Sequence, residues 1–393
     1  MSDSCSSGCG RNVPLYPKAS FQPEGIDAQL FYGDSSSGTS AFGEIGKDTV
    51  NLAGIQLTEQ HFAAINRTNT SISRTGSAGI FGLGFPVNSV IWRDTFTREV
   101  RDATPSNAIG RREAEGTTHG SVKYGSAHFP DLHHFASRFP SSLPNILSEA
   151  GSRKRQVAVG MLNLLASFSR LGPFLPRLVV DSQLALPLFT VTLQRNTMDV
   201  GGNLGLLTIG EMPPNRSVSD MTWVPVRNYS YEDGGLPSPP SSRESYPIAW
   251  EILIDEVYLD GEVLPRSNLS SSEIQLSALV DTGNSLVRGP EDVVQFIYSR
   301  LSGGRDASSP RGRFRCSEPH SLAFRIGGQL FPVDPRDFAT QLFEGDVDTC
   351  GSTLVATDPP TPGGYLFGWS LGVPFLKRWV SDFLLRSDSS YNY

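Results

Sequence analysis

The feature that most constrains this chain is one acidic residue, Asp281, between an apolar strand-like run and a tight polar turn. Leu279 and Val280 favour a buried strand, and Thr282 with Gly283 predicts a sharp turn that a ligand can approach closely. A carboxylate held at the end of a buried strand is poorly solvated and therefore chemically useful. The alternative is a surface turn that spells Asp-Thr-Gly by chance, and the triplet alone does not decide between the two.

Composition limits the fold class and the partners. The chain has 393 residues, enough for two domains that each have their own core. Its 39 glycines and 28 prolines favour many short strands and turns, so we expect a mostly-β protein with short helices. The net charge of −7 argues against a nucleic-acid binder. No apolar run is long enough to predict a membrane span.

The cysteines point to an oxidising compartment. Cys5 and Cys9 form one local group and Cys316 and Cys350 another, with no Cys-x-x-Cys metal pattern, so we expect two disulfides. Five Asn-x-Ser/Thr sequons agree with a secreted glycoprotein, at Asn66, Asn69, Asn215, Asn228 and Asn268. The first eight residues are polar and lack the apolar core of a signal peptide, which leads us to expect that the true start lies upstream.

Alternating patterns predict strands along most of the chain. Residues 26–32 and 41–50 predict a hairpin with a Gly/Ser tip, and Tyr32 beside that tip is placed to close over a ligand, although local sequence alone favours an ordinary surface hairpin. Further expected elements are a strand at 52–57, paired strands at 188–193 and 205–210, hairpins at 249–259 (with a turn at 260–261) and 324–331, and a helix from 291 to 298.

Two apolar-apolar-Gly elements suggest a faint internal duplication. They are residues 78–86, which contain Ile80, Phe81 and Gly82, and residues 370–376. We expect the first element to be buried, with glycines that permit tight backbone crossing.

Two other segments leave alternatives open. His128, His133 and His134 cluster in a polar stretch without a carboxylate or cysteine at metal-ligand spacing, so we predict loop histidines and no metal or cofactor. Residues 152–182 join a basic triplet to a Leu-rich run. They predict a proprotein-type cleavage loop, a buried helix, or an insertion foreign to the fold.

Together these motifs resemble the pepsin-like aspartic proteases, especially secreted fungal members. Leu279–Gly283 resembles the second catalytic motif, and Tyr32-Gly33-Asp34 resembles the flap, the hairpin that covers substrate. Ile80–Pro86 and Leu371-Gly372 look like the two apolar-Gly elements behind the catalytic loops. The pairs Cys5–Cys9 and Cys316–Cys350 fall where the family has its two small disulfide loops.

The resemblance implies an all-β fold of two lobes with a cleft between them. The N-terminal lobe would comprise residues 1–215 and would be incomplete, with an atypical insertion near 152–182. The C-terminal lobe would comprise residues 216–393. It further implies an acid-active endopeptidase for polypeptide substrates that needs no cofactor and acts as a monomer, extracellular or vacuolar. Asp281 would be catalytic, and the expected substrate contacts are Tyr32, Gly33, Asp34, Thr282, Gly283 and Asn284.

The sequence departs from the family pattern in four places. It has no first Asp-Thr/Ser-Gly motif, Asn284 replaces the usual Thr or Ser, residues 152–182 interrupt a continuous segment, and the tail at 380–386 lacks the expected closing strand pattern. We therefore expect an incomplete gene model of a real protease, with little activity as written, because a lone Asp281 has no second carboxylate with which to share a proton. A homodimer could supply the second carboxylate from its other copy, but the chain already resembles parts of two lobes, so such a dimer would clash with the chain's own N-terminal half. The alternatives are a non-catalytic pseudoprotease that binds peptides or sugars, and a β-sandwich adhesion module.

Overall fold

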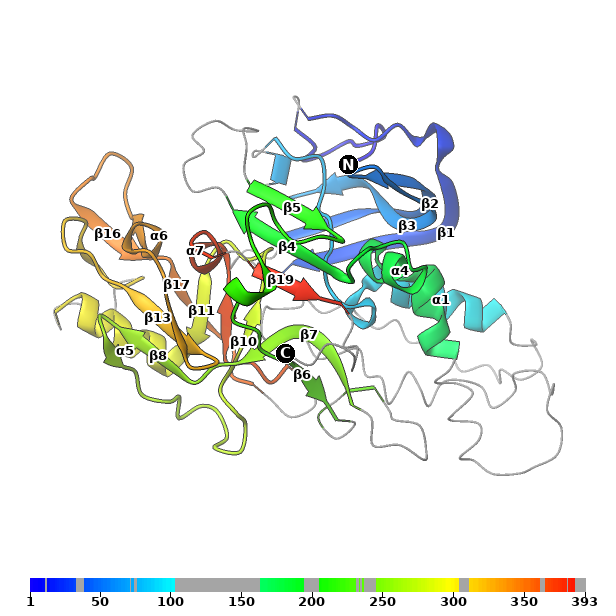
Figure 1. Cartoon of the computed structure of the whole chain (residues 1–393). Helices are drawn as coiled ribbons and strands as arrows, with labels where there is room; N and C mark the ends of the chain where they lie inside the picture. Colours follow the sequence, from blue (N-terminus) through cyan, green and yellow to red (C-terminus); the bar gives the residue numbers. More distant parts are fainter. Residues whose placement is uncertain are drawn as a thin grey trace, which may run out of the picture. The chain divides into compact units, whose positions relative to one another are not determined.

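The chain is mostly β (Figure 1). It divides into two compact units. The first unit comprises Met1–Lys123, Ala127–Ala185 and Asn228–Ile248, and the second Tyr124–Ser126, Leu186–Arg227 and Ala249–Tyr393. The expected boundary at 215/216 stays a prediction. The computed structural model describes residues 1–10, 13–32, 39–70, 72–73, 76–102, 163–193, 205–230, 233, 235–236, 245–303, 311–360, 365–379 and 381–385.

The sheet of the first unit is an antiparallel meander of β1 (Gln22–Tyr32), β2 (Thr39–Leu52) and β3 (Ile55–Thr68). The predicted hairpin over 26–50 is confirmed, with Tyr32 opposite Thr39. The predicted strand at 52–57 is wrong. Leu52 pairs with Ile55 around a two-residue turn whose Ala53 and Gly54 both have positive φ, the geometry that suits the right-handed twist of a hairpin.

Helices cover part of this unit. They are η1 (Lys18–Ser20), η3 (Pro86–Asn88), α1 (Val90–Asp102), a helical stretch at 163–171, and α4 (Phe174–Val180). Trp92 of α1 is fully buried, stacks on Phe96 at 5.5 Å and contacts the Phe168 ring at 5.0 Å. Its indole Nε1 donates to Ser167 Oγ at 2.8 Å. The segment at 163–171 is therefore part of the core.

Arg177 ties this helical segment to the sheet. Only 7% of the residue is exposed. Its guanidinium donates to the backbone carbonyls of Thr58 and Glu59 in β3 and of Ser169, at 2.9–3.3 Å. Of the three alternatives for residues 152–182, the described part at 163–180 is buried helix, because its leucines and Arg177 bury their side chains against the unit. Residues 152–162 lie outside the described residues, as do the three clustered histidines.

The largest sheet has six strands in the order β17–β11–β18–β10–β7–β6. Three smaller sheets have the orders β14–β13–β8–β9, β12–β16–β15 and β19–β4–β5. The strands are β4 (Leu188–Leu193), β5 (Gly205–Ile209), β6 (Val226–Tyr229), β7 (Tyr246–Leu253), β8 (Glu256–Leu259), β9 (Glu262–Val263), β10 (Ser277–Val280), β11 (Val287–Pro290), β12 (Phe314–Arg315), β13 (Leu322–Ile326), β14 (Gln329–Pro332), β15 (Ala339–Gln341), β16 (Thr349–Ser352), β17 (Leu354–Thr357), β18 (Trp369–Leu371) and β19 (Ser381–Leu384).

Most sequence expectations for the second unit are confirmed. β4 pairs with β5, and β13 with β14 around Gly327–Gly328. The predicted turn at 260–261 is confirmed, because β8 pairs with β9 around it, but the run at 249–259 is divided between β7 and β8, which belong to different sheets. The expected helix is α5 (Glu291–Leu301), and the described residues of this unit also form η4 (Val218–Asp220), α6 (Pro335–Phe338) and α7 (Val373–Leu376).

The tail is a correction to the sequence reading. It forms β19, which pairs with β4, because Phe383 stacks on Phe189 with ring centroids 4.7 Å apart and is buried. The expectation that this tail lacks a closing strand is therefore wrong.

Both disulfides are present. Cys5 is bonded to Cys9, and Cys316 to Cys350. The second bond joins the end of β12 to β16, whose strands pair at Phe314 and Cys350. Two disulfides indicate an extracellular or lumenal compartment. Among the described helices, none is both long and apolar enough to cross a membrane.

Candidate active site

Asp281 follows directly after β10 and is fixed by a parallel strand. β10 runs beside β18, with Ala278 opposite Trp369 and Val280 opposite Leu371. The Asp281 amide donates to the Leu371 carbonyl at 3.1 Å, which continues this pairing past the end of β10. The position of the acid is thus set by two buried strands that are distant in sequence.

The turn after Asp281 orients its carboxylate. Asp281 Oδ1 accepts a hydrogen bond from the Gly283 amide at 2.9 Å, and the Asn284 amide donates to the Asp281 carbonyl at 3.2 Å. A Cβ at Gly283 would lie 3.3 Å from Asp281 Oδ1, so glycine keeps this contact uncrowded. Asp281 and Thr282 are partly exposed, whereas Gly283 is exposed. The carboxylate is therefore held in one orientation by its own loop.

Asn284 and Gly372 interlock behind this turn. Asn284 is 2% exposed, and its Nδ2 donates to Ser370 Oγ at 3.0 Å while its Oδ1 accepts from the Leu286 amide at 3.1 Å. A Cβ at Gly372 would lie 2.1 Å from the Leu286 carbonyl oxygen and 2.2 Å from that of Asn284. The expectation that Leu371-Gly372 lies behind the Asp281 loop is confirmed, and only glycine fits there.

The comparisons with known proteins identify the family. The sequence profile of the eukaryotic aspartyl protease family matches residues 2–103 and 115–388. The chain belongs to this family. It is 30% identical over 217 residues to cathepsin E-A of Xenopus laevis, which covers 54% of this chain and 46% of that protein. Pepsin A of Sus scrofa is 33% identical over 157 residues, covering 39% of this chain and 37% of the relative. Napsin-A of Mus musculus is 27% identical over 214 residues, covering 54% and 44%.

These alignments cover less than half the length of each relative. The relatives are animal proteins, so the resemblance to fungal secreted members stays a prediction.

A buried charge network lies along the strand that carries Asp281. Glu251 of β7 is fully buried and pairs with Arg227 at 3.2 Å. Ser277, the first residue of β10, donates from its hydroxyl to Glu251 Oε1 at 2.6 Å. Burial raises the pKa of Tyr365, and the negative charges of Asp281 and Glu251 raise it further. The Tyr365 phenol therefore lies in the electrostatic field of Asp281 and Glu251.

Sequence reasoning did not find Glu251, Ser277 or Tyr365, because no local motif marks them. One signal could have revealed Glu251, because it is a single acid in the otherwise apolar strand at 248–254.

In this member of the aspartyl protease family, the hairpin expected to form the flap is described only at its base. Tyr32 is the last residue of β1 and is partly exposed. Gly33 and Asp34 lie outside the described residues. The substrate contacts expected of Tyr32, Thr282, Gly283 and Asn284 stay predictions.

The apolar-Gly element of the first unit differs from its counterpart at Gly372. Ile80 and Phe81 are 58% and 44% exposed, and no described atom lies within 4 Å of a Cβ built on Gly82. The expectation that this element is buried is therefore wrong. The physical reason is that no loop of the described residues packs over Gly82, whereas the Asp281 loop packs over Gly372.

Within the described ranges, the structure brings together no group of three or more His, Cys, Asp or Glu side chains able to hold a metal ion.

Proposed function

We propose that Asp281 is one of the two carboxylates of an aspartic endopeptidase that cleaves polypeptides at acidic pH. The observation that supports this most is the fixed carboxylate at the end of β10, paired to β18 and bonded by the Gly283 amide. In this chemistry two neighbouring carboxyl groups share one proton, because like charges so close cannot both ionise. The pair activates a water molecule for attack on the peptide carbonyl and passes the shared proton to the substrate.

The remaining proposals follow from family membership. Thr282, Gly283 and Tyr32 would contact the substrate backbone, and the protein would act as a secreted or vacuolar monomeric glycoprotein without a cofactor. The division into lobes at 215/216 belongs to the same proposal. Since the alignments cover less than half of each relative, the activity itself is part of this proposal.

The second carboxylate decides between two functions. The printed sequence contains one Asp-Thr-Gly and no Asp-Ser-Gly. One carboxyl group does not both activate water and protonate the carbonyl oxygen, so we expect little turnover by this chain alone. The second candidate is therefore a pseudoprotease that binds peptides without cleaving them.

The test compares Asp281→Asn with Asp358→Asn, an exposed acid of the same unit, as the matched control. Hydrolysis of a quenched peptide is followed at acidic pH, and binding of a peptide inhibitor with a statine-like hydroxyl by calorimetry. Turnover that Asp281→Asn lowers by about 10²–10⁴-fold, with the control unchanged, supports the endopeptidase. Inhibitor binding without turnover, weakened by Asp281→Asn, supports the pseudoprotease. If neither quantity responds to Asp281→Asn, both proposals are wrong.

A further inference from the structure

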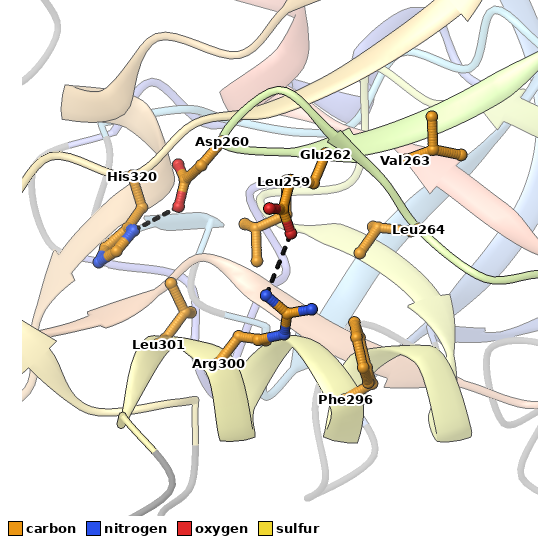
Figure 2. Close-up of a pocket in the computed structure, with 9 residues that line it drawn as sticks. All are labelled: Leu259, Asp260, Glu262, Val263, Leu264, Phe296, Arg300, Leu301 and His320. Atoms are coloured by element: carbon orange, nitrogen blue, oxygen red, sulfur yellow. Dashed lines mark hydrogen bonds and ion pairs between the residues drawn. The ribbon is translucent and has the colours of Figure 1, made fainter.

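The second unit has a surface hollow on elements that do not carry Asp281. The hollow has a volume of about 270 Å³ and is formed by β8, β9, the loop after β9, α5 and His320 (Figure 2). Small-molecule pockets usually measure about 300–1,000 Å³, so this hollow fits one amino-acid residue better than a large ligand.

The floor of this hollow is apolar. Leu259, Leu264 and Leu301 are each less than 10% exposed and belong to the hydrophobic core of the unit. Phe296 of α5 and Val263 of β9 add more accessible apolar surface, at 37% and 56% exposed. An apolar side chain placed here would lose contact with water and gain packing partners.

Arg300 supplies a cation in the middle of this floor. Figure 2 shows its side chain rising from α5 between Phe296 and Leu301, with the guanidinium directed toward Glu262. One nitrogen, Nη1, lies 3.1 Å from Glu262 Oε2, and the guanidinium carbon lies 5.2 Å from the centre of the Phe296 ring. The side chains of Arg300 and Glu262 are 56% and 73% exposed. A pair this exposed is weak, so another carboxylate can replace Glu262 at little cost.

The opposite side of the hollow is a fixed wall. Asp260 Oδ2 lies 2.7 Å from His320 Nδ1, and Asp260 Oδ1 accepts from the Ser321 amide at 2.8 Å. The His320 ring is held edge-on against Phe314, with centroids 5.0 Å apart. Because both Asp260 oxygens are engaged, this acid does not compete for Arg300, and Glu262 is the acid that does.

We propose that this hollow binds the C-terminal residue of a peptide, with its apolar side chain on the leucine floor and its free α-carboxylate on Arg300. A guanidinium presents two parallel N–H donors that match the two oxygens of a carboxylate, a geometry that Phe296 helps to orient. The site is a peptide-end exosite and does not depend on Asp281 or on peptide cleavage.

The experiment titrates the full chain with an acetylated tripeptide ending in leucine, as the free acid and as the C-terminal amide, and follows binding by NMR. A third peptide ends in serine and has a free acid. We expect the leucine acid to bind at least about tenfold more tightly than its amide, because a charged hydrogen bond is lost, and about tenfold more tightly than the serine acid, because apolar burial is lost.

Variants assign the effect to the hollow. Arg300→Gln should remove the preference for acid over amide, whereas Glu262→Gln should strengthen binding of the acid because the competing carboxylate is gone. Arg336→Gln changes an arginine that lies outside the hollow and should leave binding unchanged, as should Asp281→Asn, which separates this site from the candidate active site. Equal affinity for acid and amide, no detectable binding of the acid, or an unchanged preference in Arg300→Gln would overturn the proposal.

Discussion

The two apolar-Gly elements allow one substitution to be made twice with opposite expectations. In Gly372→Ala the new Cβ would lie 2.1 and 2.2 Å from two backbone carbonyl oxygens, whereas in Gly82→Ala no described atom lies within 4 Å. Backbone oxygens cannot rotate away as a side chain can, so the Asp281 loop or β18 has to move by about 1 Å to restore contact distances.

The expected cost of Gly372→Ala has two parts. Overpacking of this kind costs about 1–3 kcal/mol. Moving the loop also weakens the bond from the Val373 amide to the Asn284 carbonyl, now 2.8 Å, which contributes about 1 kcal/mol. The total of about 2–4 kcal/mol corresponds to a decrease in Tm of roughly 5–15 °C for a unit of this size. Gly82→Ala should change stability by less than about 0.5 kcal/mol.

Calorimetry of the intact chain measures the Tm of both variants. Hydrogen exchange of the β10 and β18 amides locates the change, because Gly372→Ala should lower protection there and Gly82→Ala should not. Equal stability of the two variants would refute the reasoning, since it would mean that the close carbonyls at Gly372 relax without cost.

Two further predictions concern buried charges. Arg177→Ala leaves backbone carbonyls of β3 unsatisfied and should lower the free energy of unfolding, measured in urea, by about 2–4 kcal/mol. The matched control is Arg170→Ala, whose arginine side chain is 58% exposed and whose loss should cost less than about 1 kcal/mol. Similar costs for the two variants would contradict the role given to Arg177. Burial raises the pKa of Asp382 to about 6, so the folded chain holds a proton that the unfolded chain releases near pH 4, and stability should fall as the pH rises from about 4 to about 6. Asp382→Asn should flatten this dependence and raise the urea midpoint at neutral pH, and an unchanged profile would show that Asp382 is not its source.

Local sequence predicted those parts of the fold that local geometry decides. Hairpins were found where a Gly-containing pair closes them, as at Gly327–Gly328 and Asp260–Gly261, because these turns need positive φ. The turn at Ala53–Gly54 was missed because alanine rarely adopts that conformation. β19 was missed because stacking of Phe383 on Phe189, not its own pattern, makes it a strand.

The dependence on local geometry also explains which residues of the candidate site the sequence predicted. The Asp-Thr-Gly turn is local, so Asp281 and the role of Gly283 were visible in the sequence. Glu251 and Tyr365 come near Asp281 through strand pairing and chain packing over long sequence separations, which no motif records. The exposure of Ile80 likewise depends on what packs over it, and an apolar pattern does not carry that information.

The parallel pairing of β10 with β18 has a consequence for biosynthesis. Ala278 has to wait for Trp369, which the ribosome adds about ninety residues later, before its strand gains this neighbour. A nascent chain thus carries Asp281 for several seconds of translation, at roughly 5–20 residues per second, before the strand that fixes its position has been made. The backbone around Asp281 is therefore fixed only after Trp369 and the rest of β18 have been synthesised.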